Sequence, residues 1–164
     1  MTRTTAREIA IQLGFAAAAS GVEPQELFES FFSEEHYATL SAEDELYSEY
    51  PGKSQLDYIR RLTDTMAERR LEIDEYIGRY AIGWKSGRIS KTALAVLRCA
   101  VCEILFMDVP ASAAINEAVE LAKGYDEPET VAFINGVLGG FVRGEFGRAE
   151  SAAEPETEAA ETTE

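Results

Sequence analysis

The chain has 164 residues, of which 46% are hydrophobic, so it is long enough to form one compact domain with a sizeable core. It carries 15 basic and 30 acidic residues, and the formal net charge of −15 excludes a general nucleic-acid binder that relies on many phosphate contacts. The sequence contains no apolar run of the roughly 18 residues that a membrane-spanning helix needs, and its start lacks the apolar stretch of a secretory signal. We therefore expect a cytoplasmic protein.

The charges are unevenly placed along the chain. Residues 1–52 carry a net charge of −8, residues 53–98 of +4, residues 99–148 of −5 and residues 149–164 of −6. A cationic middle thus lies between anionic flanks. This arrangement is compatible with docking of a strongly basic protein partner.

Apolar residues recur at helical spacing along almost the whole chain, and no alternating strand pattern stands out. The pattern predicts a first amphipathic helix over residues 4–19, which ends near Gly21, and a second helix that Pro24 opens. Residues 36–53 are acidic and end near a Tyr-Pro-Gly sequence. We expect them to connect two helical sub-bundles.

Ser54 is the predicted N-cap of the next helix, which is expected to break near Arg70. Gly83 and Gly87 bracket Trp84 in a predicted turn. From Ser90 follows the most apolar helix of the chain, which we expect at the centre of the fold.

Pro110 predicts the end of that central helix, because the residue before a proline disfavours helical backbone. Ser112 is placed to cap a helix over residues 113–124, and Asp126 begins a capping box for the last helix. The glycines at 139–140 predict fraying of that last helix. The whole pattern predicts an all-α fold of about seven helices in two sub-bundles.

Residues 149–164 contain no aliphatic residue larger than alanine, no aromatic residue and no basic residue. Such a segment cannot bury enough surface to offset its ordering entropy. We therefore expect one helical domain over residues 1–148 and a disordered acidic tail over residues 149–164. A role of the tail as an acidic interaction segment is the alternative.

The two cysteines, Cys99 and Cys102, lie three residues apart inside the apolar helix. A zinc site would need two further ligands, and the one histidine, His36, lies in a distant acidic stretch. No glycine-rich cofactor loop follows a strand, and no Ser/His/Asp set suggests catalysis. We expect no metal, no cofactor and no enzymatic activity.

Three stretches of the second half form a specific pattern: DVP at 108–110, INEAVELAK at 115–123 and FINGVL at 133–138. Upstream, the matching positions are ARE at 6–8, Gln12, Trp84 before Arg88, LRCA at 97–100, and Glu103. Over roughly residues 3–142 the sequence resembles the NusB family of transcription antitermination factors.

The resemblance implies an all-helical protein with two helical subdomains and no bond-making chemistry. NusB-type proteins pair with the small-subunit ribosomal protein that doubles as NusE, and the pair binds boxA, a short single-stranded RNA element. Together with RNA polymerase and other Nus factors, the complex suppresses premature termination, chiefly in ribosomal RNA operons, and supports ribosome biogenesis. Some relatives form a homodimer when free.

The resemblance also implies which residues contact RNA. Arg3 and Arg7 correspond to the basic N-terminal arm of the family, and their spacing places them on one helical face. Without the resemblance, both would be interpreted as solvated arginines at an exposed helix end. Further residues near the RNA surface of relatives are Lys123, Glu129 and Asn135. The alternative for Asn135 is a bond to buried backbone groups.

Phe15 and Glu103 match positions that face the ribosomal-protein partner in relatives, where Phe15 replaces a usual tyrosine. The alternative is that Phe15 packs in the core and Glu103 forms an intramolecular ion pair. Two to four basic contacts support only modest RNA binding, so we expect the heterodimer to be the binding species. A helical adaptor that binds protein but no RNA is the competing interpretation.

Overall fold

The computed structural model describes residues 1–82 and 89–147 in full, and residues 148–162 by their backbone alone. The predicted turn around Trp84, with Gly83, Gly87 and Arg88, lies outside the described residues. The side chains of the predicted tail over 149–164 also lie outside them, so the disorder of that tail stays a prediction.

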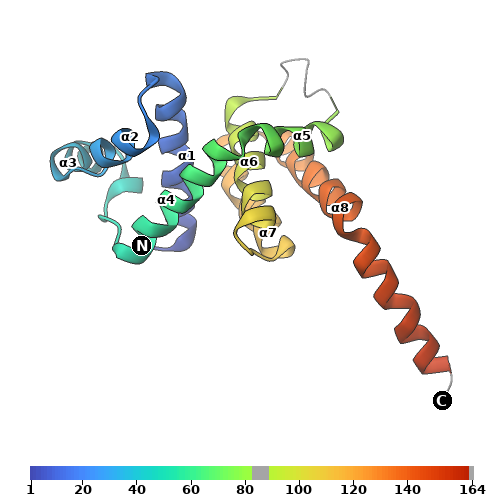
Figure 1. Ribbon diagram of the computed structural model, residues 1–164. Coiled ribbons are helices and arrows are strands. Elements are labelled where there is room, and N and C mark those ends of the chain that lie inside the picture. The colour runs from blue at the N-terminus through green and yellow to red at the C-terminus, as the bar shows by residue number, and fades with distance from the viewer. Residues whose placement is uncertain (83–88, 163–164) are drawn as a thin grey trace.

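The described residues form eight α-helices and one short 3-10 helix and contain no strand, which confirms the all-α prediction. In chain order the elements are α1 (Arg3–Ser20), α2 (Pro24–Phe31), α3 (Glu34–Glu43), η1 (Glu45–Tyr47), α4 (Lys53–Glu68), α5 (Arg70–Tyr80), α6 (Lys91–Phe106), α7 (Ala111–Tyr125) and α8 (Pro128–Thr162). Figure 1 shows α1 to α4 on one side of the molecule and α5 to α8 on the other.

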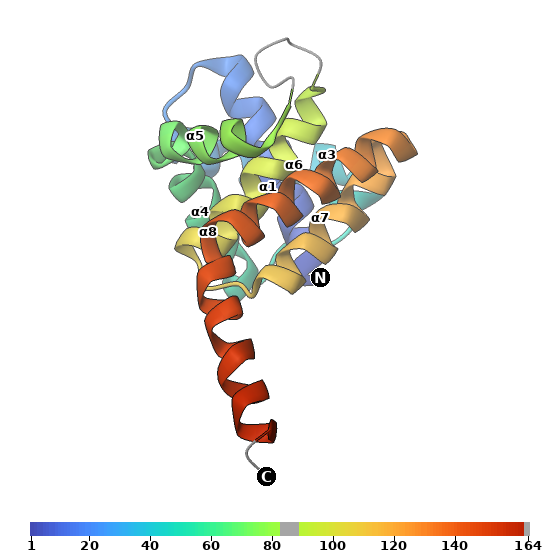
Figure 2. The ribbon, with the colours of Figure 1, turned by 90° about the vertical axis from the view of Figure 1, so that its right-hand side faces the viewer.

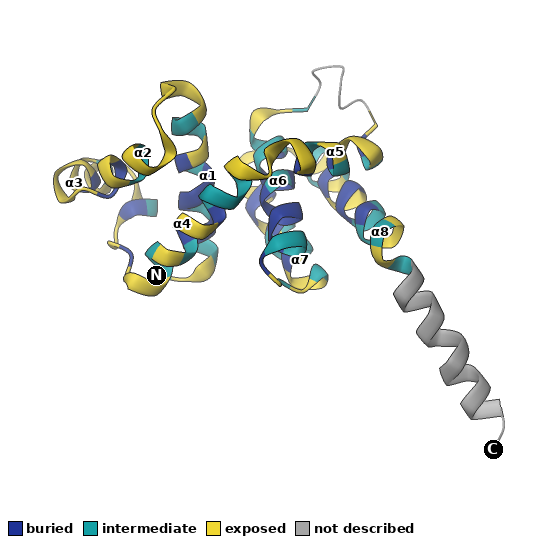
Figure 3. Ribbon diagram, viewed as in Figure 1, coloured by how far each residue is buried: buried dark blue, intermediate teal, exposed yellow. Residues whose placement is uncertain are grey.

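Helix α6 is the centre of the fold, as its apolar sequence predicts. It packs against α1, α4, α5, α7 and α8, and it thereby joins the two halves of the molecule. Figure 2 shows α7 and α8 side by side along α6. The buried residues form a single hydrophobic cluster that runs through both halves, as the dark inner faces of the helices in Figure 3 show. Its largest fully buried apolar members are Phe141, Ile9, Ile59, Leu62, Ile73, Ile77, Leu97, Ile134 and Leu138.

Local sequence signals set several helix ends as predicted. Helix α1 ends at Gly21, which adopts the left-handed conformation with φ of 67° that favours glycine. Ser90 caps α6, because its side chain accepts a hydrogen bond from the backbone N–H of Ala93. The chain breaks at Arg69, between α4 and α5, close to the predicted position.

The prediction of an acidic connection over residues 36–53 is wrong for most of its length. Helix α3 and η1 lie there, since Ser33 caps α3 and the Asp44 side chain accepts from the backbone N–H of Leu46. Tyr37 and Tyr47 are buried and pack edge to face, with ring centroids 5.7 Å apart. Capping and aromatic burial therefore outweigh the acidic composition of this segment.

Three predicted caps are also corrected. Helix α4 begins at Lys53 with Gly52 as its N-cap, so the cap lies two residues before the predicted Ser54. Helix α7 begins at Ala111 with Pro110 in the N-cap position, so the predicted cap Ser112 lies inside the helix. Asp126 is the C-cap of α7, and its carboxylate accepts hydrogen bonds from the hydroxyls of Ser90 and Thr92. Asp126, predicted to begin the last helix, therefore links the end of α7 to the start of α6.

The glycines at 139–140 do not end α8, which continues through them. A Cβ atom on Gly140 would lie 3.6 Å from Cδ1 of Tyr80, and one on Gly144 would lie 2.2 Å from its Oη. The Tyr80 hydroxyl donates to Glu145. At Gly144, therefore, a larger residue would overlap the side chain of Tyr80, the last residue of α5, whereas at Gly140 a Cβ would make ordinary van der Waals contact.

Within the described part of the chain, no helix combines the length and the apolar character required to cross a membrane.

We predict opposite effects on stability for two alanine substitutions in α8. Gly136→Ala meets nothing within 4 Å and should stabilise the fold by about 1 kcal/mol through helix propensity. Gly144→Ala should destabilise it by about 1–3 kcal/mol, because the new methyl group overlaps the Tyr80 ring. Thermal unfolding of both variants checks this, and an equal rise in Tm for both would contradict the proposed packing.

Candidate functional site

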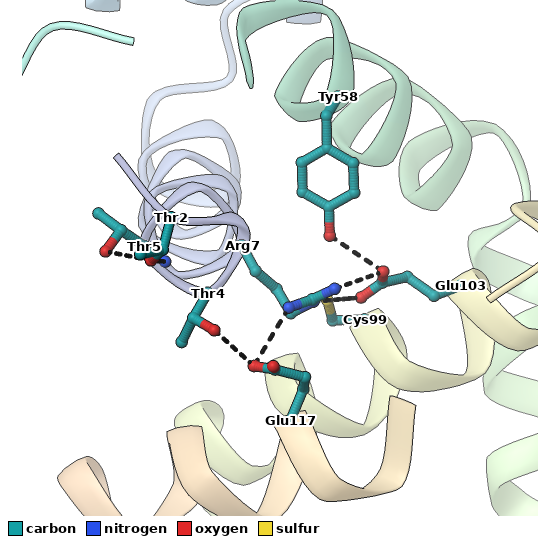
Figure 4. A network of polar contacts seen from close by, with 8 residues as sticks. All are labelled: Thr2, Thr4, Thr5, Arg7, Tyr58, Cys99, Glu103 and Glu117. Atoms are coloured by element: carbon teal, nitrogen blue, oxygen red, sulfur yellow. Dashed lines mark hydrogen bonds and ion pairs between the residues drawn. The ribbon is translucent and has the colours of Figure 1, made fainter. Parts of the chain in front are cut away.

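A buried ion pair joins α1 to α6. Arg7 is 6% exposed and Glu103 is 1% exposed. The guanidinium of Arg7 donates from Nε to Oε1 of Glu103 at 2.6 Å and from Nη2 to Oε2 at 3.0 Å. Figure 4 shows the two groups facing each other in this two-pronged arrangement, which is the strongest geometry for an arginine and a carboxylate.

Other side chains complete the network around this pair. Tyr58 of α4 donates from its hydroxyl to Oε2 of Glu103 at 3.0 Å, and the Cys99 thiol lies 3.4 Å from Oε1. Oε2 of Glu117 in α7 lies 3.3 Å from Nη1 of Arg7 and accepts from the Thr4 hydroxyl at 2.9 Å. Four helices, α1, α4, α6 and α7, therefore meet at one polar centre (Figure 4).

The charges of this centre are fixed by their neighbours. Burial alone would lower the pKa of Arg7, but the hydrogen bond and charge of Glu103 raise it overall, so the guanidinium stays charged. Burial, reinforced by Cys99 and Glu103, raises the pKa of Tyr58 well above its usual range. The tyrosine therefore remains a hydrogen-bond donor.

Burial also raises the pKa of both thiols, that of Cys102 to about 12, and the charge of Glu103 adds to the effect. Both cysteines are buried and unbridged in α6. They remain protonated at neutral pH and are poor nucleophiles and metal ligands. Among the described residues, no three His, Cys, Asp or Glu side chains form a group that could hold a metal ion.

The burial of Arg7 and Glu103 leads us to revise both predictions. The two residues were expected at separate surfaces, one facing RNA and the other a protein partner. The structure encloses both between helices and pairs them with each other, which is the alternative interpretation of Glu103. Neither side chain presents a surface to a ligand, and we assign both to the scaffold.

Arg3 lies at the outer edge of the same network. It is exposed, and its guanidinium carbon lies 4.1 Å from the centroid of the Tyr58 ring. Arg3 and Arg7 share a helical face, as predicted, but only Arg3 lies beyond the surrounding helices. Of the two arginines predicted to contact RNA, only Arg3 is therefore exposed at the surface.

The remaining candidate RNA residues lie on the surfaces of α7 and α8. Lys123 is exposed and forms an ion pair of 2.9 Å with Glu120. Glu129 lines a shallow pocket at the start of α8, and Asn135 is exposed, which argues against its alternative role with buried backbone groups. Their contact with RNA stays a prediction.

Phe15 is half-buried and lines an apolar groove of about 540 Å³ between α1, α2, α4 and α6. Leu27, Met66 and Leu94 contribute further apolar walls. Arg98, at the rim, is ion-paired with Asp74 through two contacts of 2.8 and 2.9 Å. This pairing offsets its positive charge, but Arg70 and Lys91 also line the groove, so its largely apolar walls carry two further cations.

Sequence reasoning did not single out Tyr58 and Glu117. Glu117 belongs to the INEAVELAK stretch, so its place in a recurring motif was an available signal. Tyr58 occupies an ordinary position in an amphipathic helix, and only the approach of α4 to α1 and α6 shows its contacts.

We predict that Arg7→Ala destabilises the protein by about 3–5 kcal/mol, because it leaves the Glu103 carboxylate buried without its cation. Arg3→Ala removes an exposed guanidinium and should change stability by about 0.5 kcal/mol or less. Chemical unfolding of both variants measures the difference. An Arg7→Ala protein as stable as the Arg3→Ala protein would show that the buried pair does not hold the fold together.

The known proteins similar in sequence to this chain include NusB proteins from several bacteria. The transcription antitermination protein NusB of Thermoanaerobacter sp. (strain X514) is 36% identical over 145 residues, which covers 88% of this chain and 93% of that protein. NusB of Clostridium botulinum (strain Kyoto / Type A2) is 35% identical over 140 residues, which covers 85% of this chain and 98% of that protein.

Two solved structures share the fold. T. maritima NusB superposes with a TM-score of 0.69 at 25% identity, covering 87% of this chain and 92% of that chain. A NusB chain crystallised with NusE and double-stranded RNA superposes with a TM-score of 0.68 at 24% identity, covering 87% and 96%.

The family model of the NusB family matches residues 4–143, which include the buried centre, the groove and the motif stretches at 115–123 and 133–138. This match and the curated relatives agree over most of the chain. The chain therefore belongs to the NusB family of transcription antitermination proteins.

Proposed function

We propose that this protein acts in transcription antitermination by pairing with a small-subunit ribosomal protein of the NusE type and binding boxA RNA in nascent ribosomal RNA transcripts. The observation that carries the proposal is the exposed Arg3 at the start of α1, in a chain whose net charge is −15. Such a protein has a place for RNA to begin binding but needs further cations from a partner.

The electrostatics favour a heterodimer as the RNA-binding species. With Arg7 of the predicted arm buried, and Lys123 of α7 ion-paired to Glu120, few of the predicted RNA-contacting cations are free for phosphate. The anionic body steers a basic ribosomal protein towards itself, and that partner can add its own lysines and arginines. The fold is shared with a NusB chain crystallised with NusE and double-stranded RNA, which supports this assignment.

The groove beside Phe15 is the proposed docking surface for the ribosomal protein. Its walls are largely apolar, and Phe15 contributes a half-buried aromatic ring. Aromatic side chains in apolar pockets frequently dominate the binding energy of protein interfaces. Because Glu103 is buried, we propose that the ribosomal protein binds mainly through apolar contacts in this groove and not through the Glu103 carboxylate.

The wider setting of the proposal follows from the family. The complex acts in the cytoplasm with RNA polymerase and other Nus factors, and it performs no bond-making chemistry of its own. A homodimer of the free protein, using the surface that later faces RNA, is part of the same proposal.

We predict weak RNA binding by the protein alone and clear binding once a NusE-type ribosomal protein is added. A shift assay with single-stranded boxA-type RNA measures this, and a duplex of the same sequence tests the preference for single strands. Arg3→Ala should weaken RNA binding by the pair and reduce the slope of log affinity against log salt by about 0.7. A pair that forms without any RNA binding would instead identify a protein adaptor.

We predict that Phe15→Ala weakens the ribosomal-protein complex by about 2 kcal/mol or more, because it removes an aromatic ring from the groove. The matched control is Leu71→Ala, which truncates a leucine that is 87% exposed and lies outside the groove lining. Calorimetry with the purified partner compares the two. Equal affinity of the Phe15→Ala and Leu71→Ala proteins would place the docking surface elsewhere.

A further inference from the structure

Tyr58 links the exposed arginine to the buried ion pair. On one side, the guanidinium carbon of Arg3 lies 4.1 Å from its ring centroid, within the range of a cation–π contact. At its tip, the hydroxyl donates to Oε2 of Glu103 at 3.0 Å. Figure 4 shows Tyr58 pointing from α4 into the network. The hydroxyl of Tyr58 is therefore held by Glu103, while the face of its ring contacts the exposed Arg3.

The scaffold end of this connection is rigid. Glu103 is 1% exposed and is held by two hydrogen bonds from Arg7. The Arg7 guanidinium carbon also lies 5.7 Å from the Tyr58 ring centroid, so the ring packs beside both arginines. A tyrosine whose hydroxyl is anchored in a buried ion pair cannot rotate away without breaking that bond.

The backbone that carries Arg3 is tied to α4 as well. The Gln55 side chain donates from Nε2 to the carbonyl of Met1 at 3.4 Å. The Thr2 side chain caps α1 by accepting from the backbone N–H of Thr5 at 3.1 Å. Both the main chain at the start of α1 and the side chain of Arg3 are thus held against α4.

Such an arrangement matters because a free arginine side chain loses considerable rotamer freedom when it binds a ligand. A guanidinium that is already stacked on a fixed ring loses less, and it keeps its charge and its planar N–H donors for a phosphate or a base. We propose that Tyr58 is a positioning residue for RNA binding that holds Arg3 ready for its contact. This inference rests on the proposed function and adds a residue on a helix outside the family signature.

The test uses the assembled pair of this protein and the ribosomal protein, with boxA-type RNA. Tyr58→Leu removes the ring face and should lower RNA affinity by about two- to tenfold, as expected for one side chain that must be ordered on binding. Tyr58→Phe keeps the ring but removes the hydroxyl that anchors it to Glu103, so its RNA affinity should lie between those of the unchanged protein and Tyr58→Leu. Partner affinity, measured in parallel, should be unaffected by either substitution.

A second variant avoids any effect on folding. Arg3→Lys retains the charge at an exposed position but lacks the planar group that stacks on the ring. It should lower RNA affinity to a similar extent as Tyr58→Leu while leaving the salt slope unchanged. Arg3→Ala, in contrast, should reduce the slope by about 0.7, since a phosphate contact is lost. Tyr58→Leu should have no further effect in the Arg3→Ala background.

The outcomes separate the two proposals. If Arg3→Ala weakens RNA binding but Tyr58→Leu and Arg3→Lys do not, Tyr58 does not position Arg3 and the proposed function stands. If Tyr58→Leu weakens binding equally with and without Arg3, the ring acts by another route and the inference is overturned. If Arg3→Ala binds RNA as well as the unchanged protein, the RNA role of Arg3 and the inference both fail. If Tyr58→Leu proves unstable, Tyr58→Phe decides in its place: the inference holds if this substitution weakens RNA binding only when Arg3 is present, and it is overturned otherwise.

Discussion

The ion pair between Arg7 and Glu103 is the interaction around which the two halves of this protein are arranged. It joins the first helix to the central helix, and Tyr58 and Glu117 bring in two further helices. Removing two charges from water is costly, and hydrogen bonds to the buried donors and acceptors offset that cost. Here both carboxylate oxygens of Glu103 accept hydrogen bonds, whereas Nη1 of Arg7 donates none among the described residues and lies 3.3 Å from the Glu117 carboxylate. The approach of α1 to α4, α6 and α7 is therefore specified by polar geometry as well as by apolar packing.

The burial of Arg7 also affects which cations of α1 are available for the proposed RNA contact. Because Arg7 is buried in the scaffold, Arg3 is the exposed arginine of α1, while the chain as a whole is strongly anionic. In the proposed complex, the negative field that attracts a basic partner also repels phosphate, so the partner would supply most of the cations that contact RNA. The proposed dependence on a partner rests on this charge distribution.

The groove beside Phe15 and the arginine arm belong to the same helix but differ in chemistry. The groove is apolar, and its rim arginine Arg98 is paired with Asp74. The arm is polar and exposed. In the proposed function, α1 would thus contact the protein partner towards its end and RNA at its start, with the buried ion pair between the two surfaces.

The amino-acid sequence alone determined the helical class, the central place of α6, the helix ends at Gly21 and Ser90, and the family, because apolar period, capping residues and motif spacing are local properties. Only the tertiary structure decided which charged residues are buried. Arg3 and Arg7 share a helical face, but Arg3 is exposed and Arg7 is buried. This difference depends on how closely α4, α6 and α7 approach each turn of α1. Likewise, the glycines at 139–140 predicted fraying of α8, whereas the helix continues through them, with the Tyr80 side chain packed against Gly140 and Gly144. Burial depends on neighbours that are distant in sequence, and no local pattern encodes them.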